Sequence, residues 1–193
     1  MAKFMVHPTN LQDVKLLTPT VHGDQRGFFS ESYTARDFKE VGIRQDFVQD
    51  NHSYSRQAGV LRGLHFQTGE AAQTKLIRVV TGVVYDVLVD LRQGSPTYLK
   101  TEGYLLTGHN QRQLLVPKGF AHGFVTLTDE VHFLYKCDNY YCKQAEGGIS
   151  WQTPELAGIW PLAVDQALLS PKDTQLPTLA EFRQNNPFVY GKI

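Results

Sequence analysis

The chain has 193 residues, of which 41% are apolar and 20% charged, a composition that suits one globular domain, residues 1–193, with a buried core. Its 19 Lys and Arg residues balance its 19 Asp and Glu residues, which argues against a nucleic acid or an anionic membrane held by bulk charge. No apolar run is long enough to span a bilayer, residues 1–10 lack the apolar core of a signal peptide, and Cys137 and Cys142 are too few for a disulfide scaffold, so we expect a reduced, cytoplasmic protein without a membrane partner.

Short apolar or alternating runs predict β-strands along most of the chain. In chain order these runs are residues 15–20, 26–33, 47–53, 59–67, 75–80, 83–91, 98–106, 112–116, 123–128 and 131–137. Gly and Pro turns separate many of them. This spacing indicates an all-β sandwich or barrel.

Two helix signals accompany the strands. Thr34 can cap a short helix, with Asp37 three residues later and Gly42 at its end. Residues 178–181 form a capping box directly after Pro177. We therefore expect one β domain with short peripheral helices.

Residues 59–67, G-V-L-R-G-L-H-F-Q, carry Arg62 and His65 inside an apolar, strand-like run. A buried cation and a buried imidazole are costly unless they are paired, which favours a ligand pocket where His65 handles protons. The alternative is a histidine hydrogen-bonded into a core. Arg62 and His65 are three residues apart, so a regular strand would point them to opposite faces, unless Gly63 introduces a bulge.

Residues 83–91 carry a strictly alternating apolar face that ends at Leu91. The opposite face carries Asp86 and Asp90. We therefore expect one face to lie in the core and the other to be solvated or to line a pocket.

Three further residues have side chains suited to acid–base chemistry. Lys75 opens a strand and could offer an ammonium to a developing anion, or it could be a solvated strand end. Tyr135 shares an alternating face with Val131 and Phe133, so its hydroxyl should point into the barrel, as a functional group or as a satisfied core aromatic. Asp173 could hold the tautomer of an imidazole, or it could only form a turn.

The segment P-K-G-F-A-H-G-F, residues 117–124, places His122 after a Pro/Gly turn. In jelly-roll proteins of the cupin kind, histidines at such positions often bind a metal. Most such sites add a histidine close to the first one and a carboxylate soon after, and the residues around His65 supply neither. We therefore expect no metal, with a metal site kept as the weaker alternative.

Taken together, these motifs resemble one family. They are R-G-F-F-S-E, Q-D-N-H-S, G-V-L-R-G-L-H-F-Q, the Lys75 strand, P-K-G-F-A-H-G-F, F-L-Y-K-C-D-N-Y-Y, G-I-S-W and L-S-P-K-D. In this order they resemble the dTDP-4-dehydrorhamnose 3,5-epimerases and related deoxysugar epimerases, over residues 15–179. Two positions depart from the pattern: His22, where an aromatic residue is expected, and Cys142, where a small polar residue is more usual.

The resemblance implies a cupin-like jelly roll (a double-stranded β-helix) that forms a homodimer and acts on a dTDP-sugar without a cofactor or metal. The expected reaction converts dTDP-4-dehydro-6-deoxy-D-glucose to dTDP-4-dehydro-L-rhamnose. By this resemblance His65 is the base, Asp173 its partner, Tyr135 the acid, and Lys75 the group that stabilises the enolate. The substrate's own ketone serves as the electron sink, so no redox cofactor is required.

The resemblance also implies a set of substrate contacts. The expected contacts to the sugar and diphosphate are Arg62, Gln49, Asn51, His122 and Lys172. Arg26 and Glu31 are expected to reach the site from the partner subunit, and Tyr140 to stack on the thymine.

Three other functions stay open at this stage. One is a 3- or 5-epimerase that acts at a single carbon of another dTDP-deoxysugar, since such enzymes share the same proton-transfer residues. Another is a metal-dependent cupin, such as a dioxygenase or isomerase. The last is a sugar-nucleotide binding module without catalysis.

Overall fold

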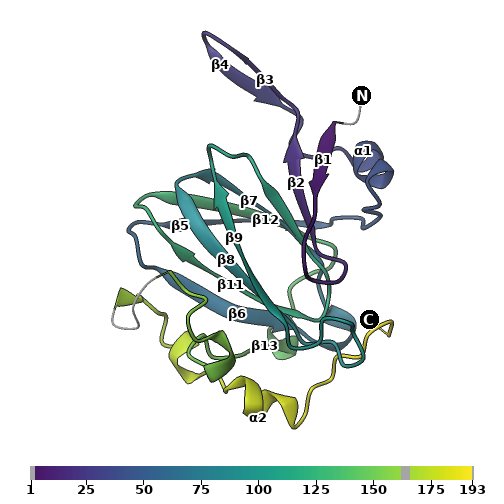
Figure 1. Ribbon diagram of the computed structural model, residues 1–193, viewed down its shortest axis with the longest axis vertical. Coiled ribbons are helices and arrows are strands. Elements are labelled where there is room, and N and C mark those ends of the chain that lie inside the picture. Colours follow the sequence, from purple (N-terminus) through teal and green to yellow (C-terminus); the bar gives the residue numbers. More distant parts are fainter. Residues whose placement is uncertain (1–2, 162–165, 193) are drawn as a thin grey trace.

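Alternating apolar residues fold the chain into two antiparallel β-sheets that face each other across a shared core (Figure 1). The structure is a computed structural model that describes residues 3–161 and 166–192. Three parts of the expected domain lie outside the described residues: residues 1–2 of the N-terminal stretch, residues 162–165 and residue 193. The expectation of a single domain stays a prediction.

The larger sheet has six strands. Their order is β1 (Phe4–His7), β2 (Lys15–Pro19), β10 (Gln113–Val116), β7 (Lys75–Thr81), β12 (Val131–Cys137) and β5 (Gln49–Ser55). The smaller sheet has five strands. Their order is β13 (Glu146–Gly148), β6 (Leu61–Gln67), β11 (Phe120–Thr126), β8 (Val83–Asp90) and β9 (Thr101–Thr107).

This pairing of strands distant in sequence is a cupin-like jelly roll, and it confirms the all-β prediction. A separate hairpin, β3 (Val21–Asp24) and β4 (Gly27–Ser30), projects away from both sheets (Figure 1). The helices are short. They are α1 (Ala35–Glu40), α2 (Leu179–Arg183) and the 3₁₀ turns η1 (Gly69–Ala71), η2 (Lys143–Ala145), η3 (Pro154–Leu156) and η5 (Asp173–Gln175). No helix in the described part of the chain is long and apolar enough to cross a membrane.

The strand predictions differ from the structure mainly at strand ends. The predicted strand 98–106 begins only at Thr101, because the preceding residues form turns in which Tyr98 N–H donates to the Ser95 carbonyl. The predicted strand 123–128 begins earlier, at Phe120, so His122 lies within β11, shortly after the predicted turn, which the structure has at Lys118 and Gly119. The short strands β1 and β13 carry too few alternating residues to be found from the sequence.

The expectation for strand β8 was half wrong, because both of its faces are buried along most of its length. Val87 and Val89 pack under the C-terminal segment, whereas Val84 and Leu88 pack between the two sheets. Asp90 is not solvated either.

Asp90 is fully buried and accepts hydrogen bonds from Arg92, Ser95 and Thr97. Arg92 also donates to Asp13. These bonds satisfy the buried charges and tie the loop after β8 to the N-terminal part of the chain.

The C-terminal segment covers the outer face of the five-stranded sheet (Figure 1). Trp151, Leu156, Leu179 and Phe188 are all buried and belong to the same apolar cluster as Leu64 of β6. Burial of each such side chain contributes on the order of 2 kcal/mol. This packing carries η5 back to β6, although the two are far apart in sequence.

The two predicted helix caps have different outcomes. Thr178 forms the predicted capping box: its hydroxyl accepts from Glu181 N–H at 3.3 Å, and its N–H donates to the Glu181 carboxylate at 2.7 Å. Thr34 occupies the N-cap of α1 but makes no side-chain cap bond, because its hydroxyl donates to Glu31 at 2.8 Å.

The difference between the two caps predicts different losses in the free energy of unfolding when each threonine is replaced by alanine. Thr178→Ala should lower the free energy of unfolding by about 1 kcal/mol because it removes a working cap. Thr34→Ala, the matched control, should lower it by no more than about 0.5 kcal/mol because its bond is exposed and caps nothing. Urea unfolding of both variants measures this, and equal losses would contradict the cap assignment.

Candidate active site

A cavity of about 550 Å³ lies between the two sheets, next to the C-terminal segment. Among the residues that line it are seven singled out from the sequence: Arg62, His65, Lys75, His122, Tyr135, Lys172 and Asp173. A smaller cavity of about 260 Å³ shares His65, Lys75 and Tyr135 with it. The smaller cavity adds the predicted residues Gln49 and Asn51, whose side-chain amides hydrogen-bond to each other at 3.0 Å.

His65 and Asp173 form a hydrogen-bonded pair at the wall of the larger cavity. His65 Nε2 lies 2.5 Å from Asp173 Oδ1, and the carboxylate is almost completely buried. Burial alone raises the pKa of Asp173, but the hydrogen bond and charge of His65, with Ser170 and Lys172, hold that pKa below its usual value. An ionised Asp173 can only accept, so the proton sits on Nε2 and leaves the other ring nitrogen, Nδ1, able to take up a proton.

Arg62 and His65 both face this cavity because strand β6 contains a bulge. His65 lies opposite His122 and Arg62 lies opposite Phe124, so the interval on β6 is one residue longer than on β11. The extra residue restores both side chains to one face. The predicted role of Gly63 is confirmed.

Gly63 permits this arrangement in two ways. Its φ of +124° is one that side chains rarely adopt, and a Cβ there would lie 2.6 Å from the Cα of Gly123 on the neighbouring strand. The absence of a side chain therefore lets β6 and β11 approach.

Lys75 and Tyr135 reach the cavity from the six-stranded sheet. The Lys75 ammonium lies 6.0 Å from the centroid of the Tyr135 ring. Burial lowers the pKa of Lys75 and raises the pKa of Tyr135, because both charged forms lose water. Tyr135 packs against the cluster that contains Val131 and Phe133, which confirms the predicted direction of its ring.

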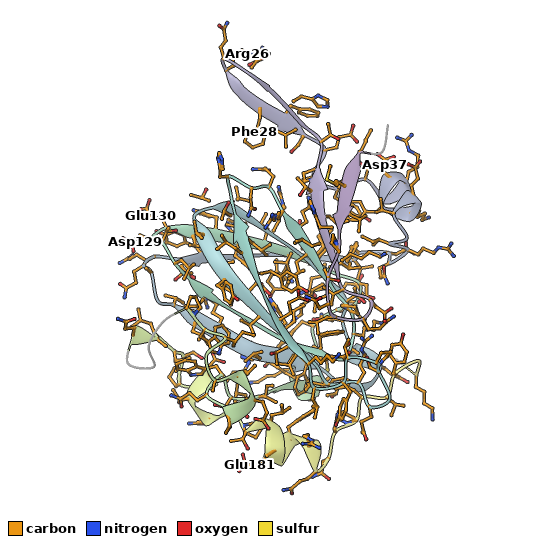
Figure 2. All side chains as sticks on the ribbon, in the orientation of Figure 1. Arg26, Phe28, Asp37, Asp129, Glu130 and Glu181 are labelled. Carbon is orange, nitrogen blue, oxygen red and sulfur yellow. The ribbon has the colours of Figure 1, made fainter. Side chains whose placement is uncertain are left out.

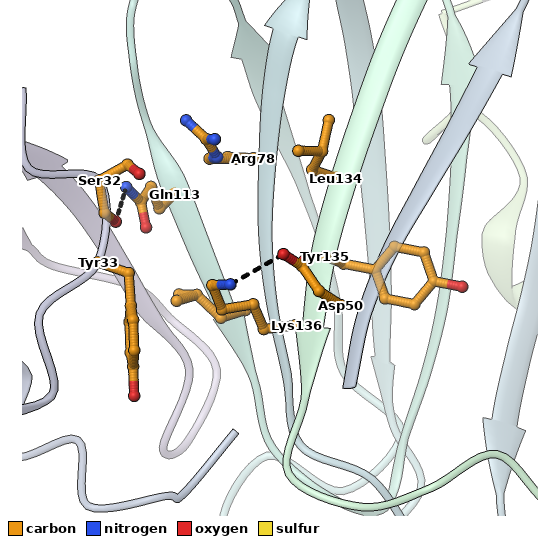
Figure 3. A pocket seen from close by; sticks show the side chains of 9 residues that line it. Ser32, Tyr33, Asp50, Arg78, Gln113, Leu134, Tyr135 and Lys136 are labelled. Atoms are coloured by element: carbon orange, nitrogen blue, oxygen red, sulfur yellow. Dashed lines mark hydrogen bonds and ion pairs between the residues drawn. The ribbon is translucent and has the colours of Figure 1, made fainter. Parts of the chain in front are cut away.

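The outer face of the same sheet carries a different hollow of about 260 Å³ (Figure 3). There Lys136 donates to Asp50 at 3.0 Å, and Gln113 donates to the Ser32 carbonyl at 2.8 Å. Figure 3 shows the Tyr135 ring on the opposite side of its strand from Lys136. Although Tyr135 borders this hollow, its hydroxyl therefore lies on the other side of the sheet.

Two carboxylates were not assigned to the site from the sequence: Glu146, which lines the smaller cavity, and Asp86, which lies behind His122. Glu146 accepts hydrogen bonds from Lys172 and, at 3.1 Å, from the Tyr141 hydroxyl. Burial raises the pKa of Glu146, but these two partners outweigh it and hold the pKa below its usual value. Asp86 Oδ2 lies 2.9 Å from His122 Nε2. The alternation of β8 was the signal that Asp86 could face the pocket side, but it did not identify the partner.

Three predicted site residues lie outside both cavities. Arg26 stands at the exposed tip of the β3–β4 hairpin, paired with Asp24 (Figure 2). Glu31 pairs with Lys3 at 2.7 Å. Tyr140 is 67% exposed and lines neither cavity, whereas the adjacent Tyr141 lines the smaller one. The sequence offered a Tyr–Tyr doublet and no signal to choose between its members.

The two departures from the family pattern, His22 and Cys142, also line neither cavity. His22 is exposed in β3, opposite Phe29. The Cys142 N–H donates to the Gln67 side chain at 2.8 Å. Within residues 3–161 and 166–192, no group of three or more His, Cys, Asp or Glu side chains is arranged to hold a metal.

Comparisons with known proteins agree with the geometry. A family model described as dTDP-4-dehydrorhamnose 3,5-epimerase matches residues 8–181. The dTDP-4-dehydrorhamnose 3,5-epimerase of Salmonella typhimurium is 49% identical over 176 residues, which cover 91% of this chain and 95% of that protein.

Two solved structures superpose on nearly the whole chain. The Bacillus anthracis dTDP-4-dehydrorhamnose 3,5-epimerase with TDP and PPi bound has 51% identity and a TM-score of 0.88, covering 91% of this chain and 99% of that one. A dTDP-6-deoxy-D-glucose-3,5-epimerase from Legionella pneumophila in complex with dTDP-4-keto-L-rhamnose has 44% identity and a TM-score of 0.91. The match covers 97% of this chain and 98% of that one.

The bulge makes Gly63 a sensitive position. Gly63→Ala should lower the free energy of unfolding by roughly 2–4 kcal/mol, since the Cβ meets backbone atoms in addition to the unfavourable φ. Gly69→Ala is the control, because Gly69 has a positive φ of +58° but open space around it, and should cost about 1 kcal/mol. Denaturant unfolding compares the two, and a Gly63→Ala loss no larger than the control's would refute the close approach.

Proposed function

The chain belongs to the dTDP-4-dehydrorhamnose 3,5-epimerase family, and we propose that it converts dTDP-4-dehydro-6-deoxy-D-glucose to dTDP-4-dehydro-L-rhamnose by epimerisation at C3 and C5. It is therefore an isomerase. The observation that carries the proposal is that His65 and Tyr135 line one cavity from opposite sheets. Epimerisation removes a proton from one face of a carbon and returns one to the other face, which suits a base and an acid on opposite walls.

His65 acts as the base. Its bond to Asp173 places a proton on Nε2 and leaves Nδ1 to abstract the proton next to the C4 ketone. The imidazolium formed by that step carries a positive charge beside the Asp173 carboxylate, which stabilises it. Asp173 thus fixes the tautomer before the step and compensates the charge after it.

Lys75 stabilises the enolate formed when the proton leaves. Burial disfavours its ammonium in the free enzyme, and a negative oxygen beside it would relieve that cost. The attraction grows as charge develops on the ketone oxygen, so it lowers the barrier more than it tightens ground-state binding. Tyr135 then protonates the carbon from the opposite wall, and its burial favours the protonated phenol that this role requires.

The two adjoining cavities suit the two parts of a sugar nucleotide. Arg62, His122 and Lys172 line the larger cavity and contact the sugar and diphosphate, with Arg62 and Lys172 as the cationic donors. Gln49 and Asn51 line the smaller one together with Tyr141. We therefore assign the stacking surface for the thymine to Tyr141 and not to Tyr140.

A second copy of the chain completes the site in this proposal. Arg26 and Glu31 belong to a projecting arm, residues 21–31, which consists of the β3–β4 hairpin and the residue that follows it. In this arm Phe28 and Phe29 are 61% and 65% exposed. The predicted contacts of Arg26 and Glu31 with substrate require the arm of a partner subunit, which supports a homodimer. Operation without cofactor or metal and a cytoplasmic location stay predictions.

Deuterium incorporation tests the reaction itself. Incubation of the protein with dTDP-4-dehydro-6-deoxy-D-glucose in deuterated water should place label at both C3 and C5, because each inverted carbon takes its new proton from solvent-exchangeable groups. Mass spectrometry and NMR of the recovered sugar locate the label. Label at one carbon only would replace the proposal with a single-site epimerase, and label at neither would remove it.

The proposed base is tested by substitution. His65→Ala and Asp173→Asn should each lower the exchange rate by about 10²- to 10⁴-fold while dTDP binding by calorimetry is preserved. His109→Ala is the control, since His109 is exposed and lies outside both cavities. Near-normal exchange in His65→Ala would rule out the base assignment.

The proposed acid predicts a split between two rates. Tyr135→Phe should retain most proton loss, measured as washout of a C5 deuterium label, but slow completed epimerisation by about 10²-fold. Tyr54→Phe, a change on the exposed outer face of the sheet, should alter neither rate. Equal slowing of washout and epimerisation in Tyr135→Phe would contradict the acid role.

A further inference from the structure

A second histidine–carboxylate pair stands beside the first. His122 lies directly opposite His65 on the neighbouring strand, and both side chains line the larger cavity. His122 Nε2 is 2.9 Å from Asp86 Oδ2, and Asp86 belongs to β8, the next strand of the sheet. The ring of His122 also stacks near Phe133, with centroids 6.2 Å apart and planes at 19°.

The burial of Asp86 at this position is unfavourable for the stability of the fold. Asp86 is fully buried, next to Val84 and Leu88 of the apolar cluster between the sheets, and its Oδ1 has no hydrogen-bond partner among the described residues. Burial raises the pKa of Asp86, opposed by His122 and by the nearby charge of Lys75. A buried carboxylate with one hydrogen bond destabilises a fold, so a purely structural role is a poor explanation for it.

Asp90, on the same strand, is a buried carboxylate whose hydrogen bonds fit a purely structural role. Its two oxygens accept from Arg92, Ser95 and Thr97, and both oxygens are used. Asp86 lacks such a network and does not itself line the cavity. Its one partner of the described chain, His122, does.

We infer that Asp86 is a positioning residue that acts through His122. Its carboxylate accepts the Nε2 proton and fixes the ring, so that Nδ1 stays unprotonated and free for a hydrogen-bond donor in the cavity. A hydroxyl of the sugar is such a donor, whereas the oxygens of a diphosphate are not. Resting on the proposed function, this assigns His122 to the sugar and leaves the diphosphate to Arg62 and Lys172.

Measurements of kcat/KM and of Tm together distinguish a positioning role of Asp86 from a purely structural one. Asp86→Asn keeps the shape but removes the charge, so kcat/KM should fall about 10- to 100-fold while Tm stays the same or rises. In the His122→Ala background the same change should have no further effect beyond about twofold, because the two residues act as one unit. Unchanged kcat/KM in Asp86→Asn, or losses that multiply in the double variant, would overturn the inference.

Asp90→Asn is the matched control. It should lower Tm because it disrupts a satisfied network, yet the folded variant should keep its kcat/KM. This is the opposite of the signature expected for Asp86→Asn. The same signature in both variants would overturn the special position of Asp86.

The protonation of His122 can be read without any substrate. In ¹⁵N-histidine-labelled protein at about pH 8, with the His122 signals assigned by their loss in His122→Ala, the proton should reside on Nε2 alone. A proton on Nδ1, or on both nitrogens, would overturn the inference. A wild type that shows the Nε2 tautomer but no deuterium exchange would defeat the proposed function and leave the Asp86–His122 pairing standing.

Discussion

The hydrogen bond between His65 and Asp173 is the interaction on which the rest of the site depends. It joins a strand of the smaller sheet to a 3₁₀ turn 108 residues later, so it exists only if the C-terminal segment folds back over the outer face of that sheet. The apolar packing of Trp151, Leu156 and Phe188 supplies the free energy that holds the segment there. The apolar packing on the outer face therefore also holds Asp173 against His65, the proposed base.

Because the two sheets face each other, they place different functional groups on opposite walls of the cavity. Histidines 65 and 122 stand on the five-stranded wall, and Lys75 and Tyr135 on the six-stranded wall. A sugar ring between the walls would meet the proposed base on one face and the proposed acid on the other. The bulge at Gly63 adds Arg62 to the histidine wall, which a regular strand would not allow.

The sequence was sufficient for the features that depend on local pattern. Alternation located the main strands and the inward face of Tyr135, and the capping box located α2. Features that depend on long-range packing were less accessible. Alternation could not tell that the second face of β8 is buried, nor which residue pairs with Asp86, because a strand's neighbours and covering layers are not encoded in its own period. That Tyr141 and not Tyr140 lines the smaller cavity was inaccessible for a similar reason, since the path of an irregular loop decides which ring turns inward.

A double-mutant cycle on the exchange rate tests most directly whether His65 and Asp173 work as one unit. Deuterium exchange is measured for the wild type, His65→Ala, Asp173→Asn and the double variant under the same conditions. The account predicts that the double variant is no slower than His65→Ala alone, because Asp173 acts only through the imidazole. Losses that multiply in the double variant would contradict it, because Asp173 would then act on the reaction independently of His65.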